Sequence, residues 1–167
     1  MNKLSSNKNH KLLRYWEALP KADKIPQRAN VDPIDMDPEI LPHIFLCSLF
    51  HNPFTVRFRL QGTYINGLLG QNYKGKELNE ETFGSSAEAI KDLYKHVAEG
   101  QGAHAVHESI KSSTGVEILA EVLYLPLLGE TGNIEFILGS IDALNLNQID
   151  MVDFVSKYWK IEDSIDL

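Results

Sequence analysis

Two histidines and a glutamate in one short stretch are the first residues whose spacing suggests chemistry. His104 and His107 are three residues apart, and Glu108 follows directly. The stretch is typical of a β-strand, in which side chains three apart point to opposite faces, so the two imidazoles do not converge on one ion. The other histidines form no i, i+4 pair, and a zinc site needs three or four convergent ligands. We therefore expect no metal site.

A glycine-rich segment is the second candidate. Gly70 to Lys76 matches a phosphate-binding loop until Glu77, which stands where Ser or Thr would hold magnesium. A carboxylate there would repel phosphates, and the residues before Gly70 predict a helix where the phosphate loop requires a strand. We interpret this segment as a turn that ends a helix and expect no nucleotide site.

The single cysteine gives no support to catalysis. Cys47 lies in the first predicted strand, where a small buried side chain is the ordinary outcome. One cysteine forms neither an internal disulfide nor a multi-thiolate metal site. The sequence has no Gly-x-Ser-x-Gly elbow and no glycine-rich kinase loop. We predict that the protein is not an enzyme.

The charge of the chain limits its partners. The 167 residues include 16 basic and 23 acidic side chains, a formal net charge of −7, which disfavours contact with a phosphate backbone. Residues 1–30 differ, with seven basic and two acidic side chains. Such an arm can touch nucleic acid or an anionic membrane. We favour a solvated helix lying against an acidic body, and expect no nucleic-acid and no membrane partner.

The length fits one domain with a sizeable core. The first residues lack the apolar centre of a signal peptide, and no stretch approaches the roughly 20 apolar residues of a membrane helix. We expect a bacterial protein that acts in the cytoplasm.

The elements that must position these side chains begin with a helix. Residues 1–9 are short, polar and terminal, and predict a disordered tail. Residues 10–42 contain apolar side chains at helical spacing up to Pro20, followed by a proline-rich connector that favours extended backbone. We expect this N-terminal unit to pack on the core.

The core is expected over residues 43–144. Strands are predicted at 44–50 and 54–61, helices at 64–69 and 85–100, and strands at 104–110, 116–127 and 134–141. Residues 145–167 predict a C-terminal helix and an acidic tail, from the spacing of the apolar residues Ile149, Val152, Val155 and Trp159. The fold class is α+β: a five-stranded antiparallel sheet with helices on one face, plus N-terminal and C-terminal helices.

Two glycines are placed where this plan changes direction. Gly62 lies where a strand turns into a helix, and Gly70 where that helix ends. Both places commonly require a positive φ, which glycine adopts at little cost.

This order of elements resembles the PAS domain superfamily. The most specific part is Arg59-Leu60-x-Gly62-Thr63 followed by Gly70, and Tyr15-Trp16 resembles the N-terminal helix of a small single-domain alphaproteobacterial PAS family. The similarity runs from about residue 11 to 144. It implies a non-catalytic sensory or interaction module in signal transduction, and it supplies no agreed ligand.

Within that fold we expect an apolar pocket between the sheet and the longer helix. The candidate ligand-binding residues are Phe58, Tyr94, Val97, Val106 and Tyr124. Simple core filling by the same five residues is the alternative. Some PAS domains hold haem through a histidine of this helix, but His96 lies about 200° around the helix from Tyr94, away from the apolar stripe. We expect no cofactor, and haem through His96 stays open.

The N-terminal helix carries more apolar surface than one contact face requires. We therefore predict a homodimer or a signalling-partner interface through Leu12, Tyr15 and Trp16. Two other functions remain open: a hydrophobic-ligand carrier or enzyme of the cone-shaped α+β type, and a structural adaptor that binds a regulator through the N-terminal arm.

Overall fold

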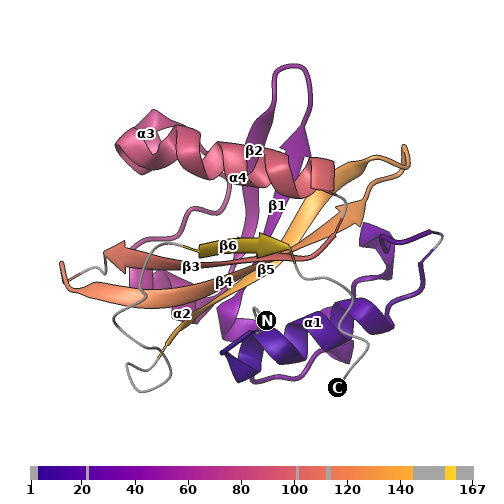
Figure 1. Cartoon of the computed structure of the whole chain (residues 1–167), viewed down its shortest axis with the longest axis horizontal. Coiled ribbons are helices and arrows are strands. Elements are labelled where there is room, and N and C mark those ends of the chain that lie inside the picture. Colours follow the sequence, from indigo (N-terminus) through magenta and orange to yellow (C-terminus); the bar gives the residue numbers. More distant parts are fainter. Residues whose placement is uncertain (1–3, 22, 101, 112–113, 145–156, 161–167) are drawn as a thin grey trace.

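The computed structural model describes residues 4–21, 23–100, 102–111, 114–144 and 157–160, and its centre is one antiparallel sheet (Figure 1). The strand order is β2-β1-β5-β4-β3-β6. The strands are β1 (Ile44–Phe50), β2 (Thr55–Gln61), β3 (His104–Lys111), β4 (Glu117–Leu128), β5 (Ile134–Ala143) and β6 (Lys157–Lys160). The predicted α+β class and the five-stranded antiparallel core are confirmed, and β6 extends the sheet.

Four α-helices of the described part of the chain surround the sheet. They are α1 (Asn7–Ala18), α2 (Thr63–Leu69), α3 (Glu80–Phe83) and α4 (Ala87–Gly100). Short 3₁₀ turns at Arg28–Asn30, Pro33–Asp35, Leu41–His43 and Gly84–Ser86 connect them to the strands. Among the described residues, no helix is long and apolar enough to span a membrane.

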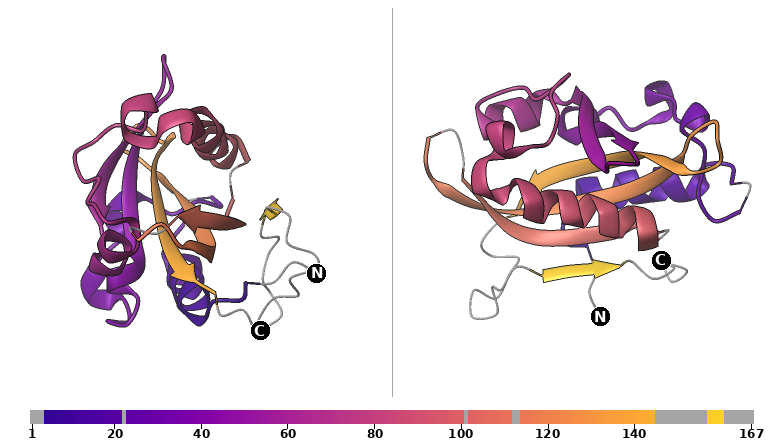
Figure 2. Two further views of the ribbon diagram at one scale, coloured as in Figure 1. Left: turned by 90° about the vertical axis from the view of Figure 1, so that its left-hand side faces the viewer. Right: turned by 90° about the horizontal axis from the view of Figure 1, so that it is seen from above.

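Helices α1 and α4 pack against opposite faces of the sheet, as Figure 2 shows from two further sides. The alternation of β4 explains this arrangement, because Tyr124 meets Tyr94 of α4 while Glu121 is hydrogen-bonded to Asn9 of α1. Residues an odd number apart on a strand face opposite sides. Strand β4 therefore contacts α4 on one face of the sheet and α1 on the other.

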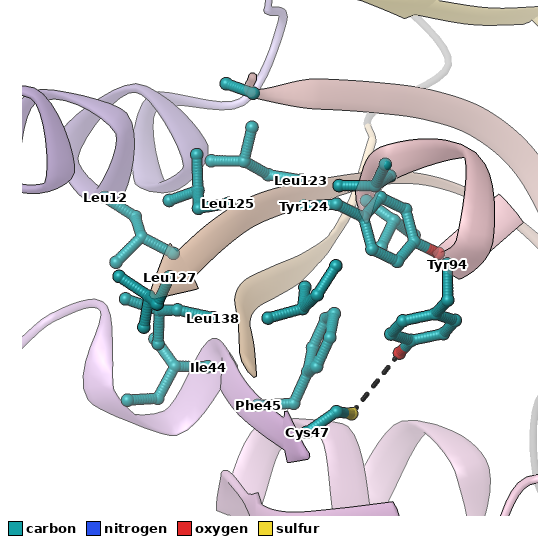
Figure 3. Packing of buried hydrophobic residues seen from close by; sticks show 14 of the residues in the cluster. Leu12, Ile44, Phe45, Cys47, Tyr94, Leu123, Tyr124, Leu125, Leu127 and Leu138 are labelled. Carbon is teal, nitrogen blue, oxygen red and sulfur yellow. Dashed lines mark hydrogen bonds between the residues drawn. The ribbon is translucent and has the colours of Figure 1, made fainter. Parts of the chain in front are cut away.

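The core follows the same division (Figure 3). Leu123, Leu125 and Leu127 of β4 lie on the α1 side, where Leu12, Ile44 and Leu138 complete a cluster of almost fully buried aliphatic side chains. Phe45, Cys47 and Tyr124 lie on the α4 side. The α1 face is therefore packed by leucines and the α4 face by aromatic rings.

The disordered tail predicted for residues 1–9 is wrong from residue 4 onward. Ser6 caps α1 by accepting a hydrogen bond from the Asn9 amide at 3.1 Å, and Leu4 is buried. The amides of Ser5 and Ser6 donate to the Glu121 carboxylate at 2.7 and 3.0 Å. Contacts with a residue far along the chain order this segment, and its composition gave no sign of them.

The predicted C-terminal helix is also wrong at its last position. Trp159 lies in β6, which pairs antiparallel with β3, rather than in a helix. The edge of β3 offers unpaired backbone groups, and a strand satisfies them where a helix would not. The other residues of that prediction, Ile149, Val152 and Val155, lie outside the described residues, as does the acidic tail.

Gly62 and Gly70 are required at their turns for different structural reasons. Gly70 has φ of 77° at the end of α2, as predicted. Gly62 has φ of −68°, so the predicted positive φ is wrong there. A Cβ on Gly62 would stand 2.2 Å from the carbonyl oxygen of Pro42. Close approach of two backbones therefore requires glycine at this position.

Candidate functional site

A cavity of about 750 Å³ lies between α4 and the sheet, and we call it the α4 cavity. Volumes of roughly 300–1,000 Å³ are usual for small-molecule sites. Its lining comes from α2, α3, α4 and the five strands β1 to β5. Six of the described lining residues are aromatic: Phe45, Phe58, Tyr73, Phe83, Tyr94 and Tyr124. The exposed residues Ser85, Ser86 and Ser109 lie at its rim.

The aromatic rings form two groups. Tyr73 stacks on Phe83 with ring centroids 4.6 Å apart, and Phe58 lies 5.6 Å from Phe83. Tyr124 meets Tyr94 edge-on at 5.3 Å and Phe45 at 5.9 Å. Such aromatic pairs are favourable beyond the area that they bury, so they stabilise this arrangement of the cavity walls.

Glu108 is the single charged side chain among the described lining residues. It is paired with Ala120 across β3 and β4, and this register places it on the α4 face. Burial raises the pKa of this carboxyl above its ordinary value. No hydrogen bond or ion pair joins the carboxylate to any side chain that the structure describes.

The Cys47 thiol lies next to the second aromatic group. Its Sγ is 3.5 Å from the Tyr94 hydroxyl, and burial raises the pKa of the thiol to about 12. Burial likewise raises the pKa of Tyr94 well above its usual value. The thiolate is the nucleophilic form of cysteine, so Cys47 is unreactive at neutral pH and packs as an apolar side chain.

Three of the five predicted pocket residues line the cavity: Phe58, Tyr94 and Tyr124. Val97 and Val106 are buried but lie outside the lining. At this end of α4 a Cβ on Gly100 would lie 2.8 Å from the His104 ring, so the helix sits directly on β3. The close contact fills the space that the sequence suggested for a ligand.

Sequence reasoning missed Glu108, Tyr73 and Phe83 as cavity residues. Tyr73 and Phe83 come from the segment after Gly70, whose fold over β2 depends on long-range backbone bonds such as Gly75 N–H to Phe58 O. The alternation with Val106 places Glu108 on the same face of β3, but the sequence pattern does not show that this carboxyl lacks a partner.

The model of the PAS domain family matches residues 4–142, which is most of the chain and includes α1. The chain belongs to the PAS domain family. PAS domains are generally sensory rather than catalytic modules. The strands β1 and β2 precede the longest helix, α4, which differs from the element order of the cone-shaped α+β folds considered as an alternative.

Several solved structures are similar to this chain at low sequence identity. VqmA bound to DPO is 15% identical with a TM-score of 0.50, over 64% of this chain and 54% of that one. A fungal LOV domain photoreceptor is 16% identical with a TM-score of 0.49, over 80% and 88%. A sensory box histidine kinase from Vibrio cholerae is 14% identical with a TM-score of 0.46, over 64% and 85%.

The chain spans about half of the VqmA chain that it matches, with 54% covered. No curated protein sequence matches it. At these identities the structural likeness concerns the fold alone.

His104 and His107 point to opposite faces of β3, as the strand geometry predicts. His104 faces α4, with its ring 5.7 Å from that of His96, while His107 Nε2 lies 2.6 Å from Glu121 on the other face. His96 is exposed and does not line the α4 cavity. Its position does not fit ligation of a haem inside that cavity.

The residues predicted for a dimer interface are mostly inside the PAS domain. Leu12 is fully buried, and Trp16 is buried with its indole N–H donating to the Pro126 carbonyl at 3.0 Å. Tyr15 is half-buried, and its hydroxyl donates to the backbone oxygen of Asp32 at 3.1 Å. The predicted interface is therefore wrong for Leu12 and Trp16, because the apolar stripe of α1 covers this chain's own sheet.

A buried polar cluster fixes α1 to that face. Glu121 accepts hydrogen bonds from His107, from the amides of Ser5 and Ser6, and from the Asn9 side chain at 3.1 Å. Burial alone would raise the pKa of Glu121, but these hydrogen bonds outweigh it and hold the pKa below its ordinary value. We call Glu121 and its four donors the Glu121 network: Ser5, Ser6, Asn9, His107 and Glu121. The network joins the first turn of α1 to β3 and β4.

Proposed function

We propose that this PAS domain is a non-catalytic sensory module that binds a small, largely apolar molecule in the α4 cavity. The observation that carries this proposal is the cavity itself, with its volume of about 750 Å³ and its six aromatic walls. Concave sites of this size with few polar groups are typical of small-molecule binding.

Two further observations support the proposal. VqmA, a chain of the same fold at a TM-score of 0.50, has been solved bound to DPO. The single thiol near the cavity is buried with its pKa raised to about 12, which leaves the site without a ready nucleophile among the residues described. Binding would signal by favouring one packing of α4 on the sheet over another.

Thermal shift against a panel of metabolites tests the proposal. A bound molecule raises the unfolding temperature according to its concentration and affinity. We expect at least one apolar compound to do so, and we expect Ala89→Trp to abolish the shift, because Ala89 lines the cavity. Lys95→Trp on the exposed side of α4 is the matched control and should keep the shift. A panel without any hit, or equal shifts in both variants, contradicts binding in the cavity.

We also propose that the domain forms a homodimer, through a surface other than the buried Leu12 and Trp16. The support is the set of apolar side chains that remain at the surface, among them Ile34, Phe50 and Leu60. Light scattering should give twice the chain mass of 18.8 kDa. A mass of 18.8 kDa at high protein concentration contradicts the dimer.

A further inference from the structure

We propose that Glu108 makes the α4 cavity selective for a small organic cation, a protonated amine carried on an apolar ring. This inference rests on the proposed function and names the class of ligand. Glu108 is the single carboxyl group among the twenty described residues that form the wall, and none of these residues is a lysine, arginine or histidine. A ligand inside the cavity therefore meets a negative charge and no positive one from these residues.

The other polar groups of the wall are largely engaged within the protein. The Gln61 amide donates to Asn66 Oδ1 at 2.9 Å and to the Gln71 carbonyl at 2.8 Å. The Thr82 hydroxyl donates to the Glu77 carbonyl at 2.7 Å as part of the cap of α3. The Tyr73 hydroxyl accepts from Gln71 at 2.7 Å. The Glu108 carboxylate has no such partner among the described side chains, so it is the charged acceptor that the lining offers to a ligand.

A half-buried carboxylate without a partner is costly, and a cation removes that cost. Burial raises the pKa of Glu108, which reports the unfavourable surroundings of its charge. An ammonium group would donate a charge-assisted hydrogen bond, the stronger kind of protein hydrogen bond. A carboxylate or phosphate on the ligand would instead face a like charge at low dielectric.

The aromatic walls favour the same class. Cations lie favourably over the faces of aromatic rings within about 6 Å. Tyr94 is close enough to Glu108 for the carboxylate charge to contribute to the raised pKa of its phenol. Tyr124 and Phe45 adjoin Tyr94, with Tyr124 5.3 Å from it. The arrangement thus combines a carboxylate for the ammonium group with rings for the body of an aromatic amine.

Three indoles that differ only in side-chain charge test the inference. They are tryptamine, which is cationic, tryptophol, which is neutral, and indole-3-acetate, which is anionic. Calorimetric titration of the full chain should give the strongest binding with tryptamine and none with indole-3-acetate. Glu108→Gln should weaken tryptamine binding about tenfold or more, the loss expected for one charge-assisted hydrogen bond. The same variant should leave tryptophol binding unchanged, which also shows that the variant is folded.

Glu81→Gln is the matched control, since Glu81 is exposed on α3 and outside the cavity lining. It removes one negative charge nearby and should leave tryptamine affinity unchanged. Equal affinity for tryptamine and tryptophol, or equal losses in the two variants, overturns selectivity by Glu108 and leaves the sensory cavity standing. Absence of tryptamine binding also overturns the inference, whereas the proposed function fails only when the wider metabolite panel gives no cavity-dependent shift.

Discussion

Glu108 and Glu121 lie on opposite faces of paired strands, and their environments shift their pKa values in opposite directions. Burial without a partner raises the pKa of Glu108. Burial also acts on Glu121, but four donated hydrogen bonds reverse the effect and lower its pKa. The two glutamates therefore differ in role: Glu108 is the proposed ligand contact on one face, and Glu121 is a structural hydrogen-bond acceptor on the other.

Glu108→Gln should make the protein more stable at neutral pH. A carboxyl whose pKa is raised on folding stabilises the folded state below its unfolded pKa and loses that contribution as the pH rises through the folded pKa. The charged form is therefore unfavourable at pH 7, and glutamine removes it. Urea unfolding at pH 4 and pH 7 should show a gain that is larger at pH 7. A gain of the same size at both pH values would mean that the charge is not the cause.

Glu121→Gln should have the opposite effect. One amide oxygen cannot replace two carboxylate oxygens that accept from Ser5, Ser6, Asn9 and His107, so donors remain unsatisfied at a cost of about 2–3 kcal/mol. The folded pKa is lowered, so the contribution of Glu121 is present above its unfolded pKa of about 4.3 and is lost as the pH falls through the folded value.

The free energy of unfolding at pH 7 and at pH 3 measures the contribution of the Glu121 carboxylate to stability. The deficit of Glu121→Gln relative to the wild type should shrink at pH 3. Glu117→Gln, on the same strand but exposed, serves as the control and should stay near the wild type at both pH values.

At the scale of elements, β2 and α2 are joined where two backbones nearly touch. The Gly62 amide donates to Ile44 O at 2.8 Å, and its α-carbon faces the Pro42 carbonyl with no room for a side chain. This contact ties the start of α2 to the turn that precedes β1. The Arg59-Leu60-x-Gly62-Thr63 motif thus has a steric reason.

Gly62→Ala should destabilise the protein by about 3 kcal/mol, because overpacking against backbone cannot relax cheaply. Gly67 lies within α2, five residues after Gly62, and a Cβ there would meet open space. Gly67→Ala should therefore be neutral or stabilising by up to about 1 kcal/mol. Urea unfolding of both variants compares them directly. A similar effect at both positions would contradict the close approach at Gly62.

Helix α1 provides a second comparison between elements. Leu12→Ala should cost about 2–5 kcal/mol of unfolding free energy, since this side chain is fully buried on the sheet. Arg14→Ala in the same helix is exposed and should change stability little. Light scattering should find the mass of the folded Leu12→Ala protein unchanged; a mass that falls to that of one chain would restore Leu12 to an interface.

At the scale of the whole molecule, the sequence predicts what depends on short-range pattern. The alternation of apolar residues over β2 and the apolar stripe of α4 predict the bounds of these two elements to within two residues. The short turns predict the antiparallel order of β3, β4 and β5. Errors occur where distant residues decide the outcome. The segment before α1 is ordered by Glu121, and Trp159 joins an open strand edge.

The candidate site was predicted only in part for the same reason. Phe58, Tyr94 and Tyr124 sit on elements whose faces can be read from periodicity. Glu108 stands out only when its neighbours are known, because absence of a partner is a property of packing.

Strand β4 lines the cavity through Val122 and Tyr124, and it carries Glu121 of the Glu121 network on its opposite face. Because both sets of side chains belong to one strand, a shift of the β4 backbone would displace both. The Ser5 and Ser6 amides, which donate to Glu121, are therefore natural reporters of cavity occupancy. Their hydrogen–deuterium exchange rates should change when the cavity fills, although both amides lie on the far side of the sheet.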